Sequence, residues 1–594
     1  MFIHVTIALL SGREANVEAL PGSSLEELRT KAQSALGIRG RLLDSRGAWL
    51  DEDMTVTEAG LRAGDLLTLQ ARPVILQASS AAWAAVLGDG CLVTWGSPFC
   101  GGHAHVEAKN VQQLCATFSA FAALDSNGSV VSWGREDWGG DCSAVEDLLE
   151  DVHEILANRF AFAAIRTDRS LVTWGEPCWG GDGPNLESVK QVQASDRAFA
   201  AIISDGSVVA WGDVLHGGDS SEVQEQLRGV QQIHGNSYAF AAIRSDGTVV
   251  TWGDPERGGN SSAVQAQLTN VRTIRASSQA FAAIRGDGSL VVWGSSFSGG
   301  DCDGVRDQLV DVRKVEATEL AFAAILANGS VVTWGQPQDG GDSRAVQGQL
   351  KTVQEVKAND FAFAAIRLDR SVVTWGDSRF GGDSSKVQEQ LQDVESLHAT
   401  GHAFAALRSD GSVVTWGCPR YGGDSSAVQE QLTKVQHIQG TFMPARDSNG
   451  GSFAAVRDDG SIITWGDRDS GGDSRRIQEQ LHMAPKRRKD SKGLRAGDLL
   501  TLQARPVILQ ASSAAWAAVL GDGCLDGGDS RAVQGQLKTV QEVKANDFAF
   551  AAIRLDRSVV TWGDSRFGGM VGVKPFDSVS IRFREFSTIS NPEP

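Results

Sequence analysis

The 594-residue chain lacks the features that mark several classes of protein. No apolar run approaches the roughly 20 residues that a membrane-spanning helix needs, so a membrane partner is not expected. The N-terminus has neither the basic start nor the cleavage site of a secretory signal. The eight cysteines form no Cys-x-x-Cys pair and no regular disulfide pattern. These absences predict a cytoplasmic protein in a reducing compartment.

The motifs of common active sites are also missing. No Ser-His-Asp arrangement can be placed, no phosphate-cradling Gly-x-x-x-x-Gly-Lys occurs, and no His or Cys set has the spacing of a metal site. We therefore expect no enzymatic activity, no metal and no cofactor. The net charge of -18 makes nucleic acid an improbable ligand and favours a protein partner.

What the chain does have is a repeat built around a Trp-Gly pair. Five consecutive steps between Trp211 and Trp416 are 41 residues each. A fixed period of about 40 residues is typical of supersecondary units that bury their apolar faces only by stacking on their neighbours. The pair recurs at Trp95, Trp133, Trp174, Trp211, Trp252, Trp293, Trp334, Trp375, Trp416 and Trp465.

One repeat, residues 271–309, contains three short strands. Residues 271–276 form the first, and residues 280–285 alternate small and bulky side chains as a packed central strand does. Asp287-Gly288 is the dipeptide of a two-residue hairpin turn, which predicts an antiparallel third strand over 289–294. A Gly-Gly-Asp sequence and a short helix, as at residues 384–391, complete the repeat, with the Asp as a helix cap.

The repeat resembles that of the regulator of chromosome condensation family, whose strand, hairpin and Trp-Gly pattern is matched by AFAALRSDGSVVTWG at residues 403–417. The resemblance covers roughly residues 74–482 and implies a β-propeller. Gly-Gly-Asp stands where the family has a Gly-Gln-Leu-Gly turn, and the short period indicates three-stranded blades. Seven blades close a ring in that family, so ten repeats leave a larger ring, two rings or an open superhelix as alternatives.

The first 72 residues carry no such repeat. Strands are predicted at residues 2–9 and 16–20, a capped helix at 25–36, and further strands at 41–43, 49–50 and 65–69. The SLEELRTKAQ sequence at 24–33, Gly37-Ile38 and residues 65–69 resemble a ubiquitin-like β-grasp domain. The resemblance implies that Leu42 and Leu43 belong to the apolar face read by ubiquitin receptors. There is no terminal diglycine, so conjugation is not implied.

The end of the chain repeats earlier sequence without change. Residues 493–525 are identical to 60–92, and residues 526–569 are identical to 339–382. The basic cluster at 485–489 is either a nuclear-import signal or a solvated linker. The predicted organisation is a ubiquitin-like domain (1–72), a repeat array (73–482), a basic linker (483–492), duplicated partial repeats (493–569) and a tail (570–594). We expect residues 483–594 to fold poorly.

Two loops vary among the repeats, the tripeptide before the second strand and the tetrapeptide after Trp-Gly. In an up-down-up meander both loops emerge at the same end, opposite the Asp-Gly hairpins. Aromatic residues on such loops favour a binding surface over sequence drift. The predicted partner-binding residues are Phe99, Trp138, Trp179, His216, Tyr238, Phe297, Phe380 and Tyr421.

The chain is thus predicted to be mainly β, with a β-grasp domain followed by a propeller-like array of about ten repeats. The favoured function is a non-enzymatic scaffold that binds protein partners. Similar repeats occur in HECT-type ubiquitin ligases, whose catalytic domain is absent here, which implies an adaptor of the ubiquitin or proteasome machinery. The alternatives are a guanine-nucleotide exchange factor for a small GTPase and a structural repeat protein without a specific partner.

Overall fold

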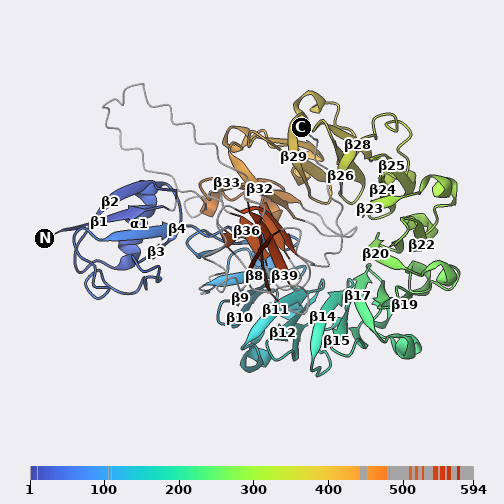
Figure 1. Cartoon of the computed structure of the whole chain (residues 1–594), viewed down its shortest axis with the longest axis horizontal. Helices are drawn as coiled ribbons and strands as arrows, with labels where there is room; N and C mark the ends of the chain where they lie inside the picture. Colours follow the sequence, from blue (N-terminus) through green and yellow to red (C-terminus); the bar gives the residue numbers. More distant parts are fainter. Residues whose placement is uncertain are drawn as a thin grey trace. The chain divides into compact units, whose positions relative to one another are not determined.

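A computed structural model describes residues 2–441 except positions 10, 105, 107 and 109, residues 451–477, residue 481 and seven strands beyond residue 507. The chain divides into two compact units, residues 1–487 and 488–594 (Figure 1). The two units are treated separately below. The predicted basic linker at 483–492 lies outside the described residues.

The N-terminal domain is one sheet packed on one helix. Its elements are β1 (Ile3–Ala8), β2 (Glu14–Ala19), α1 (Leu25–Leu36), β3 (Arg41–Leu43) and β4 (Leu66–Gln70), with the strand order β2-β1-β4-β3. Strands β1 and β4 are parallel and the other pairs are antiparallel. Ser24 caps α1 by accepting from the amide of Glu27 at 3.2 Å, and Gly37 ends it with φ 64°.

Two details of this domain bear on the sequence-based prediction. The strand predicted at 49–50 is reduced to a single bridge between Leu43 and Trp49. Leu42 and Leu43 are only 3% and 9% exposed, and Leu42 belongs to the core beneath α1. Both side chains are therefore largely inaccessible in this fold, and their role as a receptor face stays a prediction.

The repeats form ten three-stranded antiparallel sheets, numbered 1 to 10 along the chain. They are β5 (Ile75–Ala78), β6 (Ala82–Val86) and β7 (Leu92–Gly96); β8 (Val111–Ala116), β9 (Ala120–Asp125) and β10 (Val130–Gly134); β11 (Val152–Ala157), β12 (Ala161–Arg166) and β13 (Leu171–Gly175); β14 (Val189–Ala194), β15 (Ala198–Ile203) and β16 (Val208–Gly212); β17 (Val230–Gly235), β18 (Ala239–Arg244) and β19 (Val249–Gly253); β20 (Val271–Ala276), β21 (Ala280–Arg285) and β22 (Leu290–Gly294); β23 (Val312–Ala317), β24 (Ala321–Leu326) and β25 (Val331–Gly335); β26 (Val353–Ala358), β27 (Ala362–Arg367) and β28 (Val372–Gly376); β29 (Val394–Ala399), β30 (Ala403–Arg408) and β31 (Val413–Gly417); and β32 (Val435–Gly440), β33 (Ser452–Arg457) and β34 (Ile462–Gly466).

Short 3-10 helices connect the sheets. They are η1 (Pro98–Cys100), η2 (Glu136–Trp138), η3 (Ser143–Leu148), η4 (Pro177–Trp179), η5 (Val214–His216), η6 (Ser221–Gln226), η7 (Pro255–Arg257), η8 (Gln265–Gln267), η9 (Ser296–Ser298), η10 (Asp303–Gln308), η11 (Pro337–Asp339), η12 (Ser378–Phe380), η13 (Gln388–Gln390), η14 (Pro419–Tyr421), η15 (Gln429–Gln431), η16 (Arg468–Ser470) and η17 (Arg475–Ile477).

The helix predicted at residues 384–391 is therefore a 3-10 turn, η13. Asp383 accepts a hydrogen bond from the amide of Ser385 at 2.9 Å, as the capping interpretation of Gly-Gly-Asp expects. The side chain of Gln388, however, donates to the carbonyl of Val372 at 2.9 Å and ties the turn to the third strand. The pattern of apolar residues alone does not reveal this tether.

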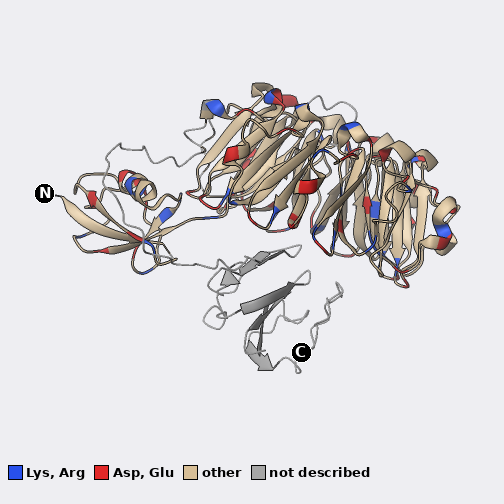
Figure 2. Cartoon of the chain, turned by 90° about the horizontal axis from the view of Figure 1, so that it is seen from above, with Lys and Arg blue, Asp and Glu red and all other residues tan. Residues whose placement is uncertain are grey.

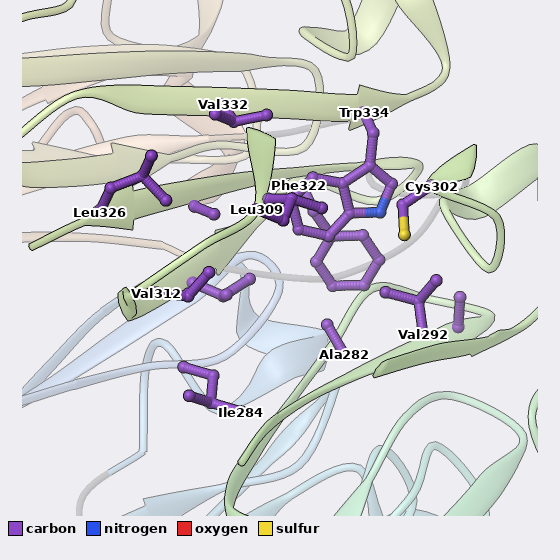
Figure 3. Close-up of a cluster of buried hydrophobic side chains, with 13 residues drawn as sticks. Ala282, Ile284, Val292, Cys302, Leu309, Val312, Phe322, Leu326, Val332 and Trp334 are labelled. Carbon is purple, nitrogen blue, oxygen red and sulfur yellow. The ribbon is translucent and has the colours of Figure 1, made fainter. Parts of the chain in front are cut away.

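Each sheet packs face to face on the next. The second strand carries Ala, Ala and Ile on one face and Phe and Ala on the other, so one sheet's small residues meet the Phe of the next. Figure 3 shows one such layer, in which Ala282 and Ile284 of sheet 6 lie near Phe322 and Trp334 of sheet 7. The rings of Phe322 and Trp334 stack at 5.2 Å. Alanine allows the close approach that this layer requires.

A single hydrogen bond recurs at every sheet boundary. The indole Nε1 of each Trp-Gly tryptophan donates to the carbonyl of a glycine that follows the third strand of the preceding sheet, at 2.9–3.2 Å. In sheet 3, for example, Trp174 donates to Gly139. Gly139 has φ 92°, and a Cβ there would lie 2.5 Å from the ring of Phe162, so only glycine fits.

The ten sheets form one closed circuit through this contact. Trp95 of sheet 1 donates to Gly471, which follows the last strand of sheet 10, at 3.0 Å. Trp83 stacks on Trp95 at 5.9 Å and donates to Ser452 of sheet 10 at 2.8 Å. No described strand pairs with a strand of a neighbouring repeat sheet, so side chains close the circuit. Of the three arrangements that the sequence left open, the larger ring is the one observed.

The N-terminal domain is fixed to sheet 1 through one buried carboxylate. Asp89, in the hairpin between β6 and β7, is 6% exposed. Its Oδ2 lies 3.3 Å from Arg39, 3.5 Å from Gln33 and 4.0 Å from Arg29. The amide of Arg72 donates to the carbonyl of Gly88 in the same hairpin at 3.0 Å. Residues 1–72 therefore do not hang from a free linker.

The unit of residues 488–594 contains copies of earlier strands. They are β35 (Ile508–Ala511), β36 (Trp516–Val519), β37 (Leu525–Asp526), β38 (Val540–Ala545), β39 (Ala549–Arg554), β40 (Ser558–Gly563) and β41 (Gly572–Pro575). The order of β38-β39-β40 repeats that of β26-β27-β28, and β41 pairs with β40. That residues 483–594 fold poorly stays a prediction.

We predict that Trp83→Ala weakens the closure between sheets 1 and 10. Removing a fully buried indole typically costs about 3–5 kcal/mol, and a lower urea midpoint with exposure of sheets 1 and 10 in hydrogen exchange would report it. Ser452→Ala leaves the indole in place but removes the hydrogen bond from Trp83 and the one that Ser452 donates to the carbonyl of Ser470, and should cost about 2 kcal/mol. Equal effects of the two substitutions would contradict a closure that rests on packing.

We also predict that Asp89→Ala releases the N-terminal domain from sheet 1. Removing one partner of a buried ion pair leaves uncompensated charge and costs about 3–5 kcal/mol. Hydrogen exchange should accelerate in α1 and in the 87–91 hairpin while sheets 3 to 9 stay protected. Asp51→Ala, an exposed carboxylate of the same domain, is the control and should leave exchange unchanged.

Candidate functional site

The two variable loops of each sheet are held together at one end by the first residue of the tripeptide. The side-chain amide of Asn158 donates to the carbonyl of Trp179 at 2.6 Å, and its Oδ1 accepts from the amides of Phe160 and Ala161, both at 2.8 Å. Asn236, Asn359, Thr117, Thr318 and Thr400 make the same link in other sheets. The loops therefore share one end of the array, here called the rim.

Aromatic rings form a ladder along the rim from sheet 2 to sheet 4. Trp138 lies 5.9 Å from Phe118 and 4.9 Å from Phe160, measured between ring centroids. Phe160 continues to Trp179 at 4.3 Å, and the guanidinium of Arg197 lies over Trp179 at 4.8 Å. Phe118 with Trp138 and Phe160 with Trp179 are pairs within one sheet, whereas the contacts of Trp138 with Phe160 and of Trp179 with Arg197 cross the sheet boundaries.

A second ladder lies on sheets 8 and 9. Phe361 and Phe380 are 4.8 Å apart, Phe380 and His402 are also 4.8 Å apart, and His402 stacks on Tyr421 at 4.5 Å. Between the ladders, His216 stacks on Tyr238 at 5.0 Å, and Arg257 lies over Tyr238 at 4.2 Å. These contacts hold the rings in fixed orientations without removing them from solvent altogether.

The predicted binding residues differ in how accessible they are. Phe99 is 87% exposed and Phe297 is 50% exposed. Trp138, Trp179, Tyr238, Phe380 and Tyr421 are half-buried among the rings just described. His216 is 9% exposed and lies 3.2 Å from Asp213, so its ring supports the rim more than it faces a partner. That the eight residues bind a partner stays a prediction.

The sequence missed half of each ladder. Phe118, at the middle of its tripeptide, and Phe160, Phe361 and His402, at the last position of theirs, complete the ring contacts. Arg197 holds the last position in sheet 4. Aligning the repeats on the second strand would have shown this column of aromatic and Arg residues, because its spacing from the strand is constant.

One end of the first ladder borders a cavity of about 470 Å³. It is lined by Pro98, Phe99, Ser119, Gly134 and Arg135. The guanidinium of Arg135 lies 3.7 Å from the ring centroid of Trp138, so the cation is held against the ladder. The cavity thus combines an exposed phenyl ring with a positioned guanidinium, a pairing common at the centre of protein interfaces.

A chain of backbone hydrogen bonds runs beneath the rim from sheet to sheet. The amide of Glu319 donates to the backbone carbonyl of Asp360 at 3.1 Å, and the amide of Asp360 donates to the backbone carbonyl of Gly401 at 3.2 Å. Asp360 is 3% exposed, and its Oδ1 has no hydrogen-bond partner among the described residues. Burial, and to a smaller extent the Glu319 carboxylate, raises the pKa of Asp360 well above its ordinary value.

Charges of both signs are interspersed along the repeats (Figure 2). Within the described part of the chain, no group of three or more His, Cys, Asp or Glu side chains is arranged to hold a metal. Nor does any described helix have the length and apolar character needed to cross a membrane. The rim itself presents aromatic rings with guanidinium groups stacked on them, as Arg135 is on Trp138 and Arg257 on Tyr238.

Comparison with known proteins gives structural similarities only. No family model and no curated protein matches the chain. Similar solved structures include Prp20p from Saccharomyces cerevisiae (13% identity, TM-score 0.30, 69% of this chain and 96% of that one) and yeast RCC1 (Prp20) bound to Kap60 (16%, 0.27, 45% and 80%). Another is the CRINKLY ectodomain of the Arabidopsis thaliana receptor kinase ACR4 (16%, 0.28, 45% and 98%). Scores this low do not establish a shared function.

We predict that Asp360→Asn stabilises the array at high pH. A raised pKa in the folded state means that Asp360 stabilises the fold when protonated, and that this contribution is lost as the pH rises from about 4 through the raised value. The melting temperature of the variant should match that of the parent near pH 4 and exceed it at pH 8.

Asp369→Asn provides the opposite case for the same measurement. Hydrogen bonds from Ser371 lower the pKa of Asp369, so its contribution is present above pH 4 and disappears in acid. That variant should be less stable than the parent at pH 8. Parallel pH profiles for Asp360→Asn and the parent would show that the buried carboxyl does not titrate against folding.

Proposed function

We propose that the chain is a non-enzymatic scaffold that binds a protein partner at the rim. The observation that carries this proposal is the aromatic ladder with its stacked arginines, which lies on loops while the sheets beneath keep a uniform sequence. Aromatic and Arg side chains dominate interface energetics because they bury large areas at small entropic cost. The cavity at Phe99 and Arg135 gives such a partner an anchoring point.

The ring contacts decide which substitutions test the proposal. Replacing Trp138 or Trp179 would disturb neighbouring loops, since each packs on Phe160. Phe99 and Phe297 are largely free of such packing and are 87% and 50% exposed. They can be changed with little effect on the fold.

We predict that Phe99→Ser combined with Phe297→Ser weakens partner capture at least about tenfold, as the loss of one interface anchor typically does. The control is Val310→Ser with Leu368→Ser, two exposed apolar residues away from the rim loops, 58% and 64% exposed. Both variants should melt like the parent. Quantitative pull-down from lysate, followed by titration of the identified partner, measures the effect. Equal capture by both double variants would remove the rim as the binding site.

The identity of the captured partner separates the finer versions of the proposal. An adaptor of the ubiquitin or proteasome machinery rests on the resemblance of residues 1–72 to ubiquitin-like domains. Since Leu42 and Leu43 are buried, such an adaptor would need another surface of that domain. An exchange factor would instead accelerate nucleotide release from a small GTPase. If the chain is instead a structural repeat protein, the same capture experiment should recover no specific partner.

A further inference from the structure

A second surface with binding chemistry lies where the N-terminal domain meets sheet 1. Trp49 is 41% exposed. The guanidinium carbon of Arg41 lies 5.1 Å from its ring centroid, and that of Arg72, in the segment after β4, lies 5.0 Å from it. One exposed indole therefore packs against two arginine side chains, of which Arg41 also donates to Asn110. This surface is separate from the rim, and the inference drawn from it does not rest on the function proposed for the rim.

The arginines of this junction outnumber the buried carboxylates that face them. Glu52 is shared between Arg29 at 3.2 Å and Arg41 at 3.7 Å. Asp89 is shared between Arg39 at 3.3 Å and Arg29 at 4.0 Å. A third carboxylate, Glu26, lies 3.9 Å from Arg29 but is itself largely exposed.

Arg72 is the arginine without a counter-charge. Within the described residues, no acidic side chain lies within ion-pair distance of it, and its side-chain contact is the indole of Trp49. Burial and the neighbouring charge of Arg41 lower the pKa of Arg72. Arg41 shares Glu52 with Arg29, and Arg72 adds a further cation beside Arg41, so repulsion between these two guanidinium groups costs free energy unless an anion joins them.

We propose that Arg41 and Arg72 on Trp49 form a binding site for an oxyanion carried by a peptide, either a carboxylate or a phosphate. The planar guanidinium fork of Arg72 binds such a group with two parallel hydrogen bonds, and Arg41, whose Nη1 already donates to Asn110, adds its charge and its remaining N–H donors. Stacking on Trp49 fixes both guanidinium groups before binding, which reduces the entropic cost. The exposed part of the indole contacts the residue beside the acidic one. The local excess of positive charge is notable in a chain with net charge -18.

The test uses the full chain labelled with 5-fluorotryptophan. The chain has 16 tryptophans, so the Trp49 resonance is assigned by its loss in Trp49→Phe. At constant ionic strength, the protein is titrated with inorganic phosphate, with acetate, with a glutamate-rich peptide and with a phosphoserine peptide. We expect a saturable shift of the Trp49 signal, and the peptide that binds more tightly identifies the source of the oxyanion.

Variants separate a specific site from general screening. Arg72→Gln should weaken binding roughly tenfold, equivalent to the loss of one charge-assisted contact, and Arg72→Lys, which keeps the charge but loses the fork, should fall between. Arg62→Gln changes an exposed arginine of the same domain and should bind like the parent. The remaining fluorine signals report whether each variant is folded.

The proposal is overturned by any of three results. The first is a Trp49 shift that grows linearly with every anion, and the second is equal affinity in Arg72→Gln and the parent. The third is an equal loss in Arg62→Gln and Arg72→Gln.

Discussion

The hydrogen bond from each indole to a glycine carbonyl of the preceding sheet is the contact on which the array depends. A three-stranded sheet has two apolar faces and cannot bury both alone. The bond sets how closely and at what rotation the next sheet packs, because its glycine has a positive φ and lies directly against an aromatic ring, a Phe at nine boundaries and Trp83 at Gly471. Since the same bond joins all neighbouring sheets, one local geometry is applied ten times. The circuit closes at Trp95 and Gly471 by the same bond, supplemented there by the hydrogen bond from Trp83 to Ser452.

Much of the array could be predicted from the sequence because it depends on local rules. The alternation of small and bulky side chains predicts the strands, the Asp-Gly pairs predict the hairpins, and the 41-residue spacing predicts the repeat. Closure could not be predicted, since it depends on a small rotation per sheet accumulated over ten sheets. The tie between η13 and β28 is a single side-chain contact to Val372, Leu42 belongs to the core beneath α1, and Leu43 forms a bridge with Trp49. These are tertiary effects that residue spacing does not encode.

The rim shows how a rigid frame leaves room for variation. The anchor of each loop is one Asn, Ser or Thr that bonds to the backbone of the neighbouring loop, for example Asn158 to Trp179 or Thr400 to Tyr421. The side chains at the other loop positions do not make this anchoring hydrogen bond and can therefore vary. Aromatic rings placed there pack on one another across sheet boundaries, so they are ordered before any partner arrives, and little side-chain entropy remains to be lost on binding.

The N-terminal domain and the rim use opposite ends of the repeat sheets. Asp89 belongs to the hairpin between the second and third strands, whereas the rim consists of the loops at the other end of those strands. A partner on the rim therefore leaves the junction at Trp49 accessible, and a ligand at Trp49 leaves the rim accessible. Because Asp89 fixes the domain to sheet 1, two ligands bound at these places would be held at a constant separation. A fixed spacing between two recognition surfaces is the property that distinguishes a scaffold from a flexible tether.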